Sequence, residues 1–386
     1  MRATRNDSTG SSPVLYMAYD LGWTSWKLGF GVGRGHKPRC RTIRARDLEQ
    51  LEQEIAAAKK RFKLPKDASV MSCYEAGRDG WWLHRYLESQ GILNLVVDSS
   101  SIEVNRRQRR AKSDGLDTAK LLMMLMRYAN GDSEAWSVVR PPRVEDEDDR
   151  QLHRELLSLK SEQTRHVNRI KGLLAGWGLQ VTAVQRLPQV LSHLQTWDGG
   201  HLPPQLRQRL LREWERLQLV QRQIGQLERE RLQVLRESTS RKAVQMRTLM
   251  ELRGIGVNSA WLYVMEIFGW REIRNRRELA SLCGLAPTPN QSGTDDHEQG
   301  ISKAGNWRMR RMAVEIAWCW LRWQPQSELS QWFEQRFGAG GKRTRRVGIV
   351  AVARKLLVQL WRYLETGELP AGAVLKPEAA LAPAAG

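Results

Sequence analysis

Four carboxylates stand where they could share a metal ion. Asp20 ends a short apolar segment, VLYMAYDLG, and Glu75 ends another, SVMSCYEA. Asp114 and Asp117 lie three residues apart at the start of a helical pattern, so they share one face of that helix. Hard oxygen ligands of this kind suit Mg²⁺, which binds through a few carboxylates together with substrate phosphates. Two such ions can stabilise both the attacking and the leaving oxygen in phosphoryl transfer.

The four carboxylates can meet only if the segments that carry them are neighbours. Three strand-like segments joined by short turns come first and should pair antiparallel, whereas the later strands alternate with helices and should pair in parallel. With the first strand in the centre and the fourth beside it, Asp20 lies next to Glu75. This order predicts an RNase H-like α/β fold. The expected strands cover 14–22, 26–33, 39–45, 69–76 and 92–98, and the expected helices run from Asp47 to Phe62, from about residue 82, and over 114–128.

Each acid also has a simpler interpretation when it is taken alone. Asp20 stands two residues before Gly22 and could be a turn former. Asp114 could be an acidic residue that interacts favourably with the dipole of the helix it begins. The metal hypothesis therefore depends on the four acids as a set.

The stretches YEAGRDGWWLHRYL and VVDSSSIEVNRRQRRAKSDGLDTAKLL resemble the RuvC-like N-terminal domain of the DEDD transposases of bacterial insertion sequences, which are bridge-RNA-guided recombinases. The resemblance implies that Asp20, Glu75, Asp114 and Asp117 are the catalytic metal ligands. The family commonly reads K-T-D-R-x-D-A at the last pair. This chain reads KSDGLDT, in which Gly115 replaces a basic residue and both acids are kept.

The stretches LRGIGVNSAWLYVMEI and LASLCGLAPTPNQSGTDDHEQGISKAGNWRMRRMAVEIAW resemble the C-terminal transposase domain of the same family. The resemblance implies that Ser292, in PNQSG, is the nucleophile and forms a covalent bond to DNA. By residue type alone, a Ser-Gly pair in a polar loop is usually a turn, and a serine hydroxyl needs activation. The rival Ser302 is predicted to cap the next helix.

Two departures from the family pattern lie near this serine. Gln291 stands where the family often has serine. The residues that follow are acidic where the family is often basic, namely Asp295, Asp296 and Glu298.

Charge and composition limit the partners. The chain has 386 residues and a formal net charge of +20 with a sequence pI of about 10.3, so a polyanionic partner is expected. With 41% hydrophobic residues it is not a disordered polycation. No apolar run approaches the roughly 20 residues that span a bilayer, and neither a secretory signal nor a CxxC motif occurs. We expect a reduced, cytoplasmic bacterial protein.

The basic residues gather beside the proposed chemistry. They precede the Asp pair, follow the serine loop and begin the last helix. LRGIGVNSA also resembles a helix–hairpin–helix that would offer backbone N–H groups to a phosphate, although a tight turn between packed helices is an equal alternative. The predicted nucleic-acid contacts are Arg106, Arg107, Arg109, Arg110, Lys112, Gly254, Gly256, Lys303, Arg308, Arg310, Arg311, Lys342, Arg343, Arg345 and Arg346.

Composition shifts divide the chain into five parts. A flexible leader over 1–12 precedes the RuvC-like domain over 13–143. Two long helices with narrow apolar stripes predict a coiled-coil connector over 144–240, which is either a plain connector or an oligomerisation arm. An all-α C-terminal domain covers 241–369, and an Ala/Pro/Gly-rich tail over 370–386 is expected to be disordered.

Tryptophan is abundant, with 16 residues. Tryptophan can fill cores or stack on bases. Most of Trp307, Trp318, Trp320, Trp323 and Trp332 are expected in the core. One of the adjacent pair Trp81 and Trp82 is a candidate stacking platform.

Together these features favour a Mg²⁺-dependent DNA transposase or recombinase that uses Ser292. The resemblance further implies donor and target DNA, a structured guide RNA and a homodimer or homotetramer. Two alternatives remain. One is a RuvC-like junction endonuclease that uses water, and the other is a catalytically silent nucleic-acid-binding protein.

Overall fold

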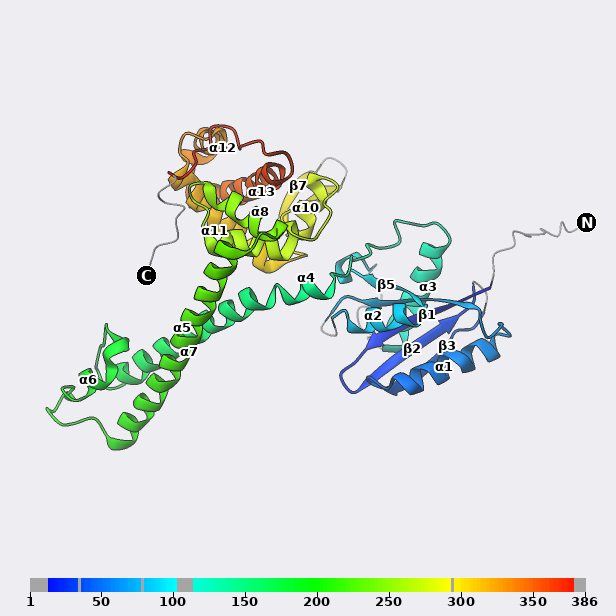
Figure 1. Cartoon of the computed structure of the whole chain (residues 1–386), viewed down its shortest axis with the longest axis horizontal. Coiled ribbons are helices and arrows are strands. Elements are labelled where there is room, and N and C mark those ends of the chain that lie inside the picture. The colour runs from blue at the N-terminus through cyan, green and yellow to red at the C-terminus, as the bar shows by residue number, and fades with distance from the viewer. Residues whose placement is uncertain (1–12, 34–35, 78–79, 103–113, 293–294, 378–386) are drawn as a thin grey trace, which may run out of the picture. The chain divides into compact units, whose positions relative to one another are not determined.

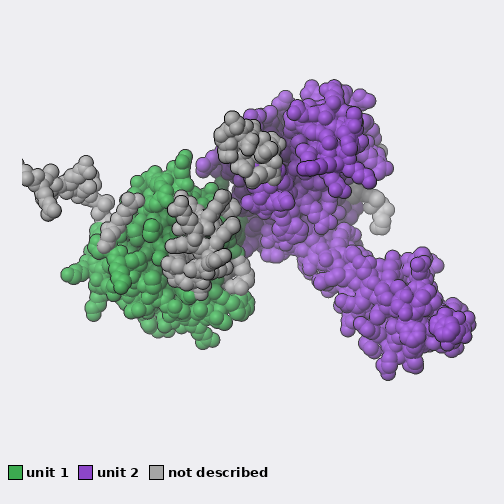
Figure 2. All heavy atoms as spheres, turned by 180° about the vertical axis from the view of Figure 1, so that it is seen from behind, with its two compact units in different colours: residues 1–142 green, residues 143–386 purple. Residues whose placement is uncertain are grey.

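A computed structural model describes residues 13–33, 36–77, 80–102, 114–292 and 295–377, without the side chains of 100, 114–117 and 289–299. The chain divides into two compact units, Met1–Pro142 and Arg143–Gly386 (Figure 2). The predicted contacts Arg106, Arg107, Arg109, Arg110 and Lys112 lie outside the described residues. No helix in the described ranges is long and apolar enough to cross a membrane.

The first unit is built on a five-stranded sheet of order β3-β2-β1-β4-β5. β1, β2 and β3 pair antiparallel and β4 and β5 run parallel to β1, as predicted. The predicted cap is also confirmed, because Asp47 accepts a hydrogen bond of 2.9 Å from the Gln50 amide. The elements are β1 Val14–Leu21, β2 Ser25–Gly31, β3 Arg39–Arg44, α1 Leu48–Arg61, β4 Ser69–Glu75, α2 Trp82–Ser89, β5 Leu93–Val97, the short helix Ser99–Ser101 and α3 Asp114–Ala129.

The two faces of this sheet bury different helices (Figure 1). On β1, Tyr19 belongs to the core that includes residues of α1 and α2, whereas Ala18 belongs to the core formed with α3. α3 lies close to the sheet because β2 offers a glycine: a Cβ at Gly29 would stand 2.8 Å from Cγ2 of Thr118. Residue alternation along each strand therefore decides which side chains face α3.

The two predicted long helices form a pair in the second unit, as Figure 1 shows. The pair is antiparallel, since Leu159 shares a core with Ile224 and the later Ile170 shares one with the earlier Leu210. Buried Glu213 accepts hydrogen bonds from Arg169 and His166 across the pair and another from Arg216 of its own helix. The elements here are α4 Val144–Asp148, α5 Gln151–Ala175, η3 Val184–Arg186, α6 Leu187–Leu191 and α7 Pro204–Glu237.

The rest of the second unit is helical except for a β-hairpin, so the all-α prediction is wrong there. β6 pairs with β7 antiparallel over a segment predicted as a polar loop. Its strands carry few apolar residues, so the sequence shows no alternation of apolar and polar residues that would predict them. The elements are α8 Arg241–Glu251, α9 Val257–Tyr263, the π-helix η4 Val264–Phe268, α10 Arg276–Leu282, β6 Pro287–Ser292, β7 Asp295–Ile301, α11 Trp307–Trp323, α12 Glu328–Phe333, the π-helix η5 Glu334–Gly338 and α13 Lys342–Thr366.

The start of the expected tail is part of this unit instead. The Val374 amide donates to Oε1 of Gln324 at 2.8 Å. Nζ of Lys376 donates to the carbonyls of Met250 and Ile255 at 2.6 and 2.7 Å. These polar anchors hold residues 370–377 against the unit, and composition alone did not reveal them.

The tryptophan predictions need correction. Trp320 is buried, but Trp307, Trp318 and Trp323 are exposed, because α11 turns Met309, Ala313, Ile316 and Trp320 inward. Trp81 and Trp82 are both half-buried and pack against the core of the first unit, which leaves neither as a fully exposed platform.

Candidate active site

Asp20 and Glu75 emerge side by side at the ends of neighbouring strands. The parallel register pairs Tyr19 with Tyr74, so the next residue on each strand is one of the two acids. The tyrosine rings meet on the face that carries α1 and α2. Alternation therefore places both acids on the opposite face, which α3 covers. Asp20 is half-buried and Glu75 is exposed.

The first turn of α3 lies at the same end of the sheet. Thr118 packs on Gly29, which pairs with Ala18, whereas the later Met126 approaches Gly31, which pairs with Tyr16. The C-terminal end of α3 therefore lies farther from Asp20 than its N-terminal end does. The turn that holds Asp114 and Asp117 precedes Thr118 and lies nearest the strand ends. The structure brings the backbone of all four predicted ligands to one edge.

The donor set at this edge suits a hard divalent cation. Among the side chains that the structure describes, no group of three or more potential ligands is assembled, and those of Asp114 and Asp117 are outside this set. Carboxylates are hard oxygen ligands, and Mg²⁺ binds through one or two of them together with water and substrate phosphates. Lys27 stands directly across from Asp20 on β2. No local pattern in the sequence points to this basic neighbour, which only the hairpin register reveals.

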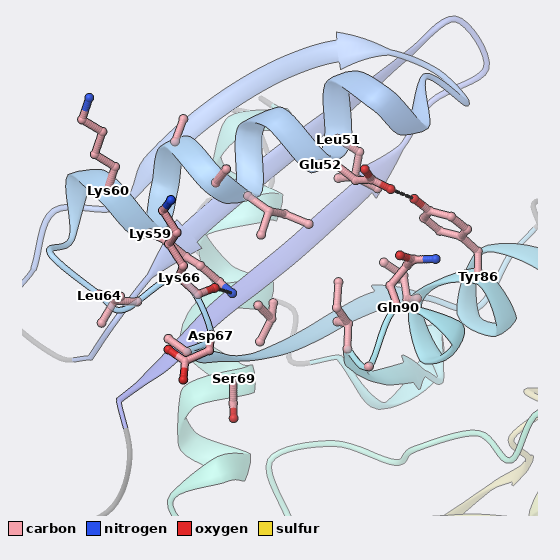
Figure 3. A pocket seen from close by; sticks show the side chains of 18 residues that line it. Leu51, Glu52, Lys59, Lys60, Leu64, Lys66, Asp67, Ser69, Tyr86 and Gln90 are labelled. Carbon is pink, nitrogen blue, oxygen red and sulfur yellow. Dashed lines mark hydrogen bonds between the residues drawn. The ribbon is translucent and has the colours of Figure 1, made fainter.

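A hollow in the first unit lies away from this edge (Figure 3). It has a volume of about 1110 Å³ and lies between α1 and α2, lined by residues such as Leu51, Ile55 and Leu87. Tyr86 Oη at its rim donates to Glu52 at 2.6 Å, and partial burial together with this carboxylate raises the pKa of Tyr86 to about 12. Because the hollow opens on the face opposite α3, it is separate from the four acids.

Ser292 is the last residue of β6 and pairs with Asp295 across the hairpin. The base of the hairpin is fixed by backbone bonds: Ser302 donates to Ala286 at 2.9 Å and Lys303 to Gly284 at 3.2 Å. Asn306, not Ser302, caps α11, so the predicted cap is wrong. Asn306 Oδ1 reaches two amides of the first turn, which the Ser302 side chain, four residues earlier, does not.

A buried carboxylate, Glu266, links α5 to the residue that caps α11. Glu266 on η4 accepts two hydrogen bonds from Arg154 of α5, at 2.9 and 3.0 Å, and a third from Asn306 Nδ2 at 3.0 Å. Burial opposes ionisation of Glu266, but the hydrogen bond and charge of Arg154 keep its pKa below the ordinary value. The network joins the long helix α5 to the residue that begins α11.

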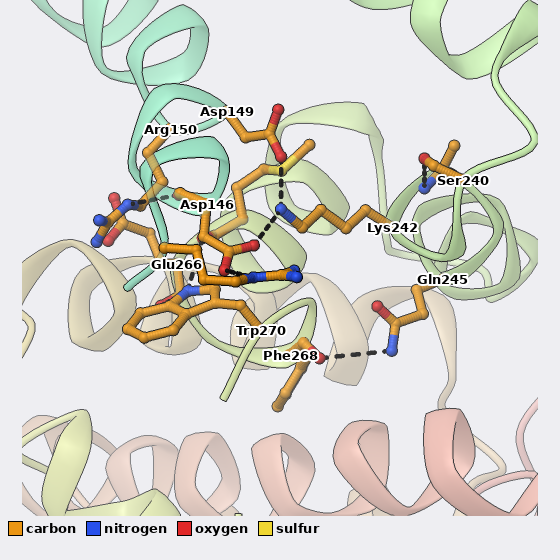
Figure 4. Close-up of polar contacts among 12 residues, drawn as sticks. Asp146, Asp149, Arg150, Ser240, Lys242, Gln245, Glu266, Phe268 and Trp270 are labelled. Atoms are coloured by element: carbon orange, nitrogen blue, oxygen red, sulfur yellow. Dashed lines mark hydrogen bonds and ion pairs between the residues drawn. The ribbon is translucent and has the colours of Figure 1, made fainter. Parts of the chain in front are cut away.

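A second polar network secures the start of α5 (Figure 4). Nζ of Lys242 donates to Asp146 at 2.6 Å and to Asp149 at 2.5 Å. Arg150 lies over the ring of Trp270, with 5.3 Å between its Cζ and the ring centroid. These contacts tie α4 and α5 to the C-terminal helices, and we assign them a structural role.

The predicted basic contacts fall into different environments. Arg310 donates to the Lys303 carbonyl at 2.8 Å, Arg311 pairs with Glu315 at 2.8 Å and Arg345 lies over Phe333, so these three have intramolecular partners. Arg308 lies over the exposed ring of Trp307. The Lys342 side chain is exposed at the start of α13. Lys303, Arg343 and Arg346 line a groove of the second unit.

The two predicted glycine contacts lie in the turn between α8 and α9. Gly254 has a positive φ of 88° and packs close to the backbone of Cys319 on α11. The Gly256 amide donates to Oγ of Ser259 at 3.1 Å. This geometry matches a tight turn between packed helices, and a phosphate contact here stays a prediction.

Comparison with known proteins places the chain among transposases. The profile described as "Transposase IS116/IS110/IS902 family" matches residues 246–331, a range that includes Ser292. The chain is 38% identical over 378 residues to "Putative transposase y4rJ" of Sinorhizobium fredii, covering 94% of this chain and 95% of that protein. It is 28% identical over 227 residues to the transposase for insertion sequence element IS1328 of Yersinia enterocolitica, covering 57% and 64%. It is 25% identical over 185 residues to the transposase for insertion sequence element IS1111A of Coxiella burnetii, covering 48% and 50%.

Proposed function

The chain belongs to the IS110/IS116 family of insertion-sequence transposases, and from this premise we propose that it cuts and rejoins DNA with four carboxylates of its first unit and one serine of its second. The observation that carries the proposal is the strand register. It sets Asp20 beside Glu75 on the face covered by α3, whose first turn holds Asp114 and Asp117.

In this proposal the carboxylates hold Mg²⁺. When bound there, the ion would lower the barrier by stabilising negative charge on the phosphate oxygens. The contribution of the chain is positional. Asp20 and Glu75 are held by the backbone ladder of two paired strands, and the close packing of Thr118 on Gly29 fixes the helix that carries the other two acids. Such rigid support keeps ligand positions from drifting.

Ser292 is proposed as the nucleophile. Its Oγ forms a bond to phosphorus as the bond from phosphorus to one deoxyribose oxygen breaks, and the serine proton ends on that departing oxygen. The product is a serine–DNA phosphodiester and a free hydroxyl, so a later attack by another DNA hydroxyl can reverse the step on a new partner. The anchored hairpin base supports this role by presenting Ser292 on a fixed stem.

We propose further that a structured guide RNA selects donor and target DNA, and that the protein acts as a homodimer or homotetramer in the bacterial cytoplasm. The RNA follows from the family resemblance, and the net charge of +20 supports a large polyanionic partner. The antiparallel pair α5 and α7 offers a long arm on which copies could associate. An assembly would also allow the acids of one copy to meet the serine of another.

The test is a search for the covalent species. Protein with its co-purified RNA is incubated with paired DNA substrates and Mg²⁺, quenched in detergent and run on a denaturing gel. Wild type should give a slower-migrating protein–DNA band that Ser292→Ala abolishes while DNA binding is kept. Ser302→Ala is the matched control and should keep the band.

Other outcomes would redirect the proposal. Cleavage that survives Ser292→Ala, with no adduct in wild type, would falsify it in favour of a water-using endonuclease. DNA binding without cleavage, unchanged by Asp117→Ala, would indicate a silent binding protein.

A further inference from the structure

A groove of about 1500 Å³ crosses the second unit beside the hairpin that carries Ser292. Its walls come from α10, the base of β6 and β7, α12, η5 and one side of α13. Apolar side chains, including Ile301, Trp332 and Val350, form part of its lining. Residues separated by more than 80 positions in sequence therefore meet in one hollow at the base of the hairpin that carries Ser292.

The charged side chains of this groove are almost all basic. Only Glu328 among the lining residues carries a carboxylate. Nine basic residues line the groove, and six of them were not among the predicted contacts because they are dispersed along the sequence. The nine are Arg276, Arg277, Lys303, Arg336, Arg343, Arg346, Arg354, Lys355 and Arg362.

This charge has no counterpart within the described part of the protein. None of the nine side chains forms an ion pair with a described carboxylate, in contrast to Arg154 and Lys242 of the same unit. Lys355 instead rests on the ring of Trp332, with Nζ 4.5 Å from the centroid. So many uncompensated cations around one hollow repel one another, and a bound polyanion would relieve that repulsion.

Basic side chains recur along the side of α13 that faces the groove. Arg343, Arg354 and Arg362 recur along one side of the helix, with Val347, Val350 and Val358 between them. At 1.5 Å per residue, Arg343 and Arg362 are about 28 Å apart along the axis, which equals roughly eight base-pair steps of a duplex. A nucleic-acid strand offers phosphates at regular intervals with less polar sugars between them. An acidic protein surface has no such repeat.

We propose that this groove binds the sugar–phosphate backbone of duplex DNA and guides one strand to the hairpin of Ser292. The choice of DNA rests on the family to which the chain belongs, and the role of Ser292 as destination rests on the proposed function. The binding itself requires neither cleavage nor metal. The groove therefore contributes affinity and position, whereas sequence choice lies elsewhere.

The test measures binding apart from chemistry. All proteins carry Ser292→Ala and are assayed in EDTA by fluorescence anisotropy with a labelled 24-base-pair duplex over a salt series. The groove variant replaces three exposed residues, Arg343→Gln, Lys355→Gln and Arg362→Gln. It should weaken binding roughly tenfold or more at 0.15 M salt, and should lower the slope of log affinity against log salt by about 3.

The matched control removes the same charge from exposed positions of the arm: Arg209→Gln, Arg222→Gln and Arg229→Gln on α7. It should leave the slope close to that of the parent. Equal losses in both variants, or no loss in the groove variant, would overturn the proposal. So would a loss confined to an RNA probe of the same sequence, which would assign the groove to RNA.

The groove proposal and the proposed role of Ser292 can be refuted independently of each other. If wild type forms no serine adduct but the groove variant loses DNA binding, the groove proposal is supported and the role of Ser292 as nucleophile is refuted. If the adduct forms at full rate in a groove variant that retains Ser292, the role of Ser292 as nucleophile is supported and the groove proposal is refuted.

Discussion

The rings of Tyr19 and Tyr74 meet edge to face, with centroids 6.5 Å apart, one residue before the neighbouring strand ends Asp20 and Glu75. Both rings are buried, and they sit on the face opposite α3. A slip of one residue between β1 and β4 would expose one ring and turn one acid away from its partner. Core packing on one face thus fixes the position of carboxylates on the other.

We predict that Asp20→Asn and Glu75→Gln each reduce strand cleavage by at least about 100-fold, because loss of a proposed metal ligand should cost more than loss of a residue that only positions a ligand. Both proteins should stay folded, since Asp20 is half-buried and Glu75 exposed. Cleavage rates and far-UV circular dichroism measure these outcomes. The control is Asp67→Asn, an exposed carboxylate near the other end of β4, which should keep full activity. Equal activity in all three variants would exclude a metal site at the strand ends.

We predict that Gly29→Ala disturbs the edge without touching a carboxylate. The new Cβ would stand 2.8 Å from Cγ2 of Thr118, so α3 must shift, at a cost of about 1–3 kcal/mol in stability. Cleavage should fall as well, because Asp114 and Asp117 move with α3. Melting temperature and cleavage rate give the two readouts.

The second substitution Thr118→Ser removes the clashing methyl group and should restore part of both properties. The next neighbours of the new Cβ, the carbonyl oxygen and Cβ of Thr118, stand at 3.6 and 3.8 Å, which is ordinary contact. A double variant no better than Gly29→Ala would show that the effect does not pass through this contact.

We predict a pH dependence from His153 of α5. The side chain is buried, and within the described residues neither ring nitrogen has a hydrogen-bond partner. Burial, followed by the positive charge of Arg231, lowers its pKa to about 4 from the 6.5 of the unfolded chain. A lowered histidine pKa means that the folded state holds the neutral form, so its contribution is complete above pH 6.5. It declines as the pH falls toward 4.

The full change is on the order of 3 kcal/mol. Urea unfolding of wild type and His153→Leu at pH 7.5, 6, 5 and 4.5 measures it. Wild type should lose more stability than the variant over this range, while acid effects on Glu213 and Glu266 are common to both proteins. Parallel losses would contradict the prediction.

Much of the first unit could be predicted because its signals are local. Short turns join the first three strands and helices separate the later ones, which settles pairing direction and puts Asp20 beside Glu75. The long helices of the arm were predictable from apolar residues recurring at helical spacing over α5 and α7. In the second unit the hairpin was missed, since its strands are held by backbone pairing and offer no apolar alternation.

For the candidate site too, some properties could be predicted from the sequence and others needed the structure. The types and spacing of Asp20, Glu75, Asp114, Asp117 and Ser292 are properties of the sequence, and so is the excess of basic residues. The sequence does not reveal which basic side chains have partners within the chain. Arg310 and Arg311 have such partners, whereas Arg354 and Lys355 line a groove.

The sequence by itself determined the order of the elements, the residues able to do chemistry and the need for a polyanionic partner, because these depend on neighbours along the chain. Tertiary structure alone decided the inward side of α11, the anchoring of residues 370–377 and the gathering of nine basic side chains from positions 276 to 362. The physical reason is that burial and charge compensation depend on contacts between distant segments. No local pattern records which segments those will be.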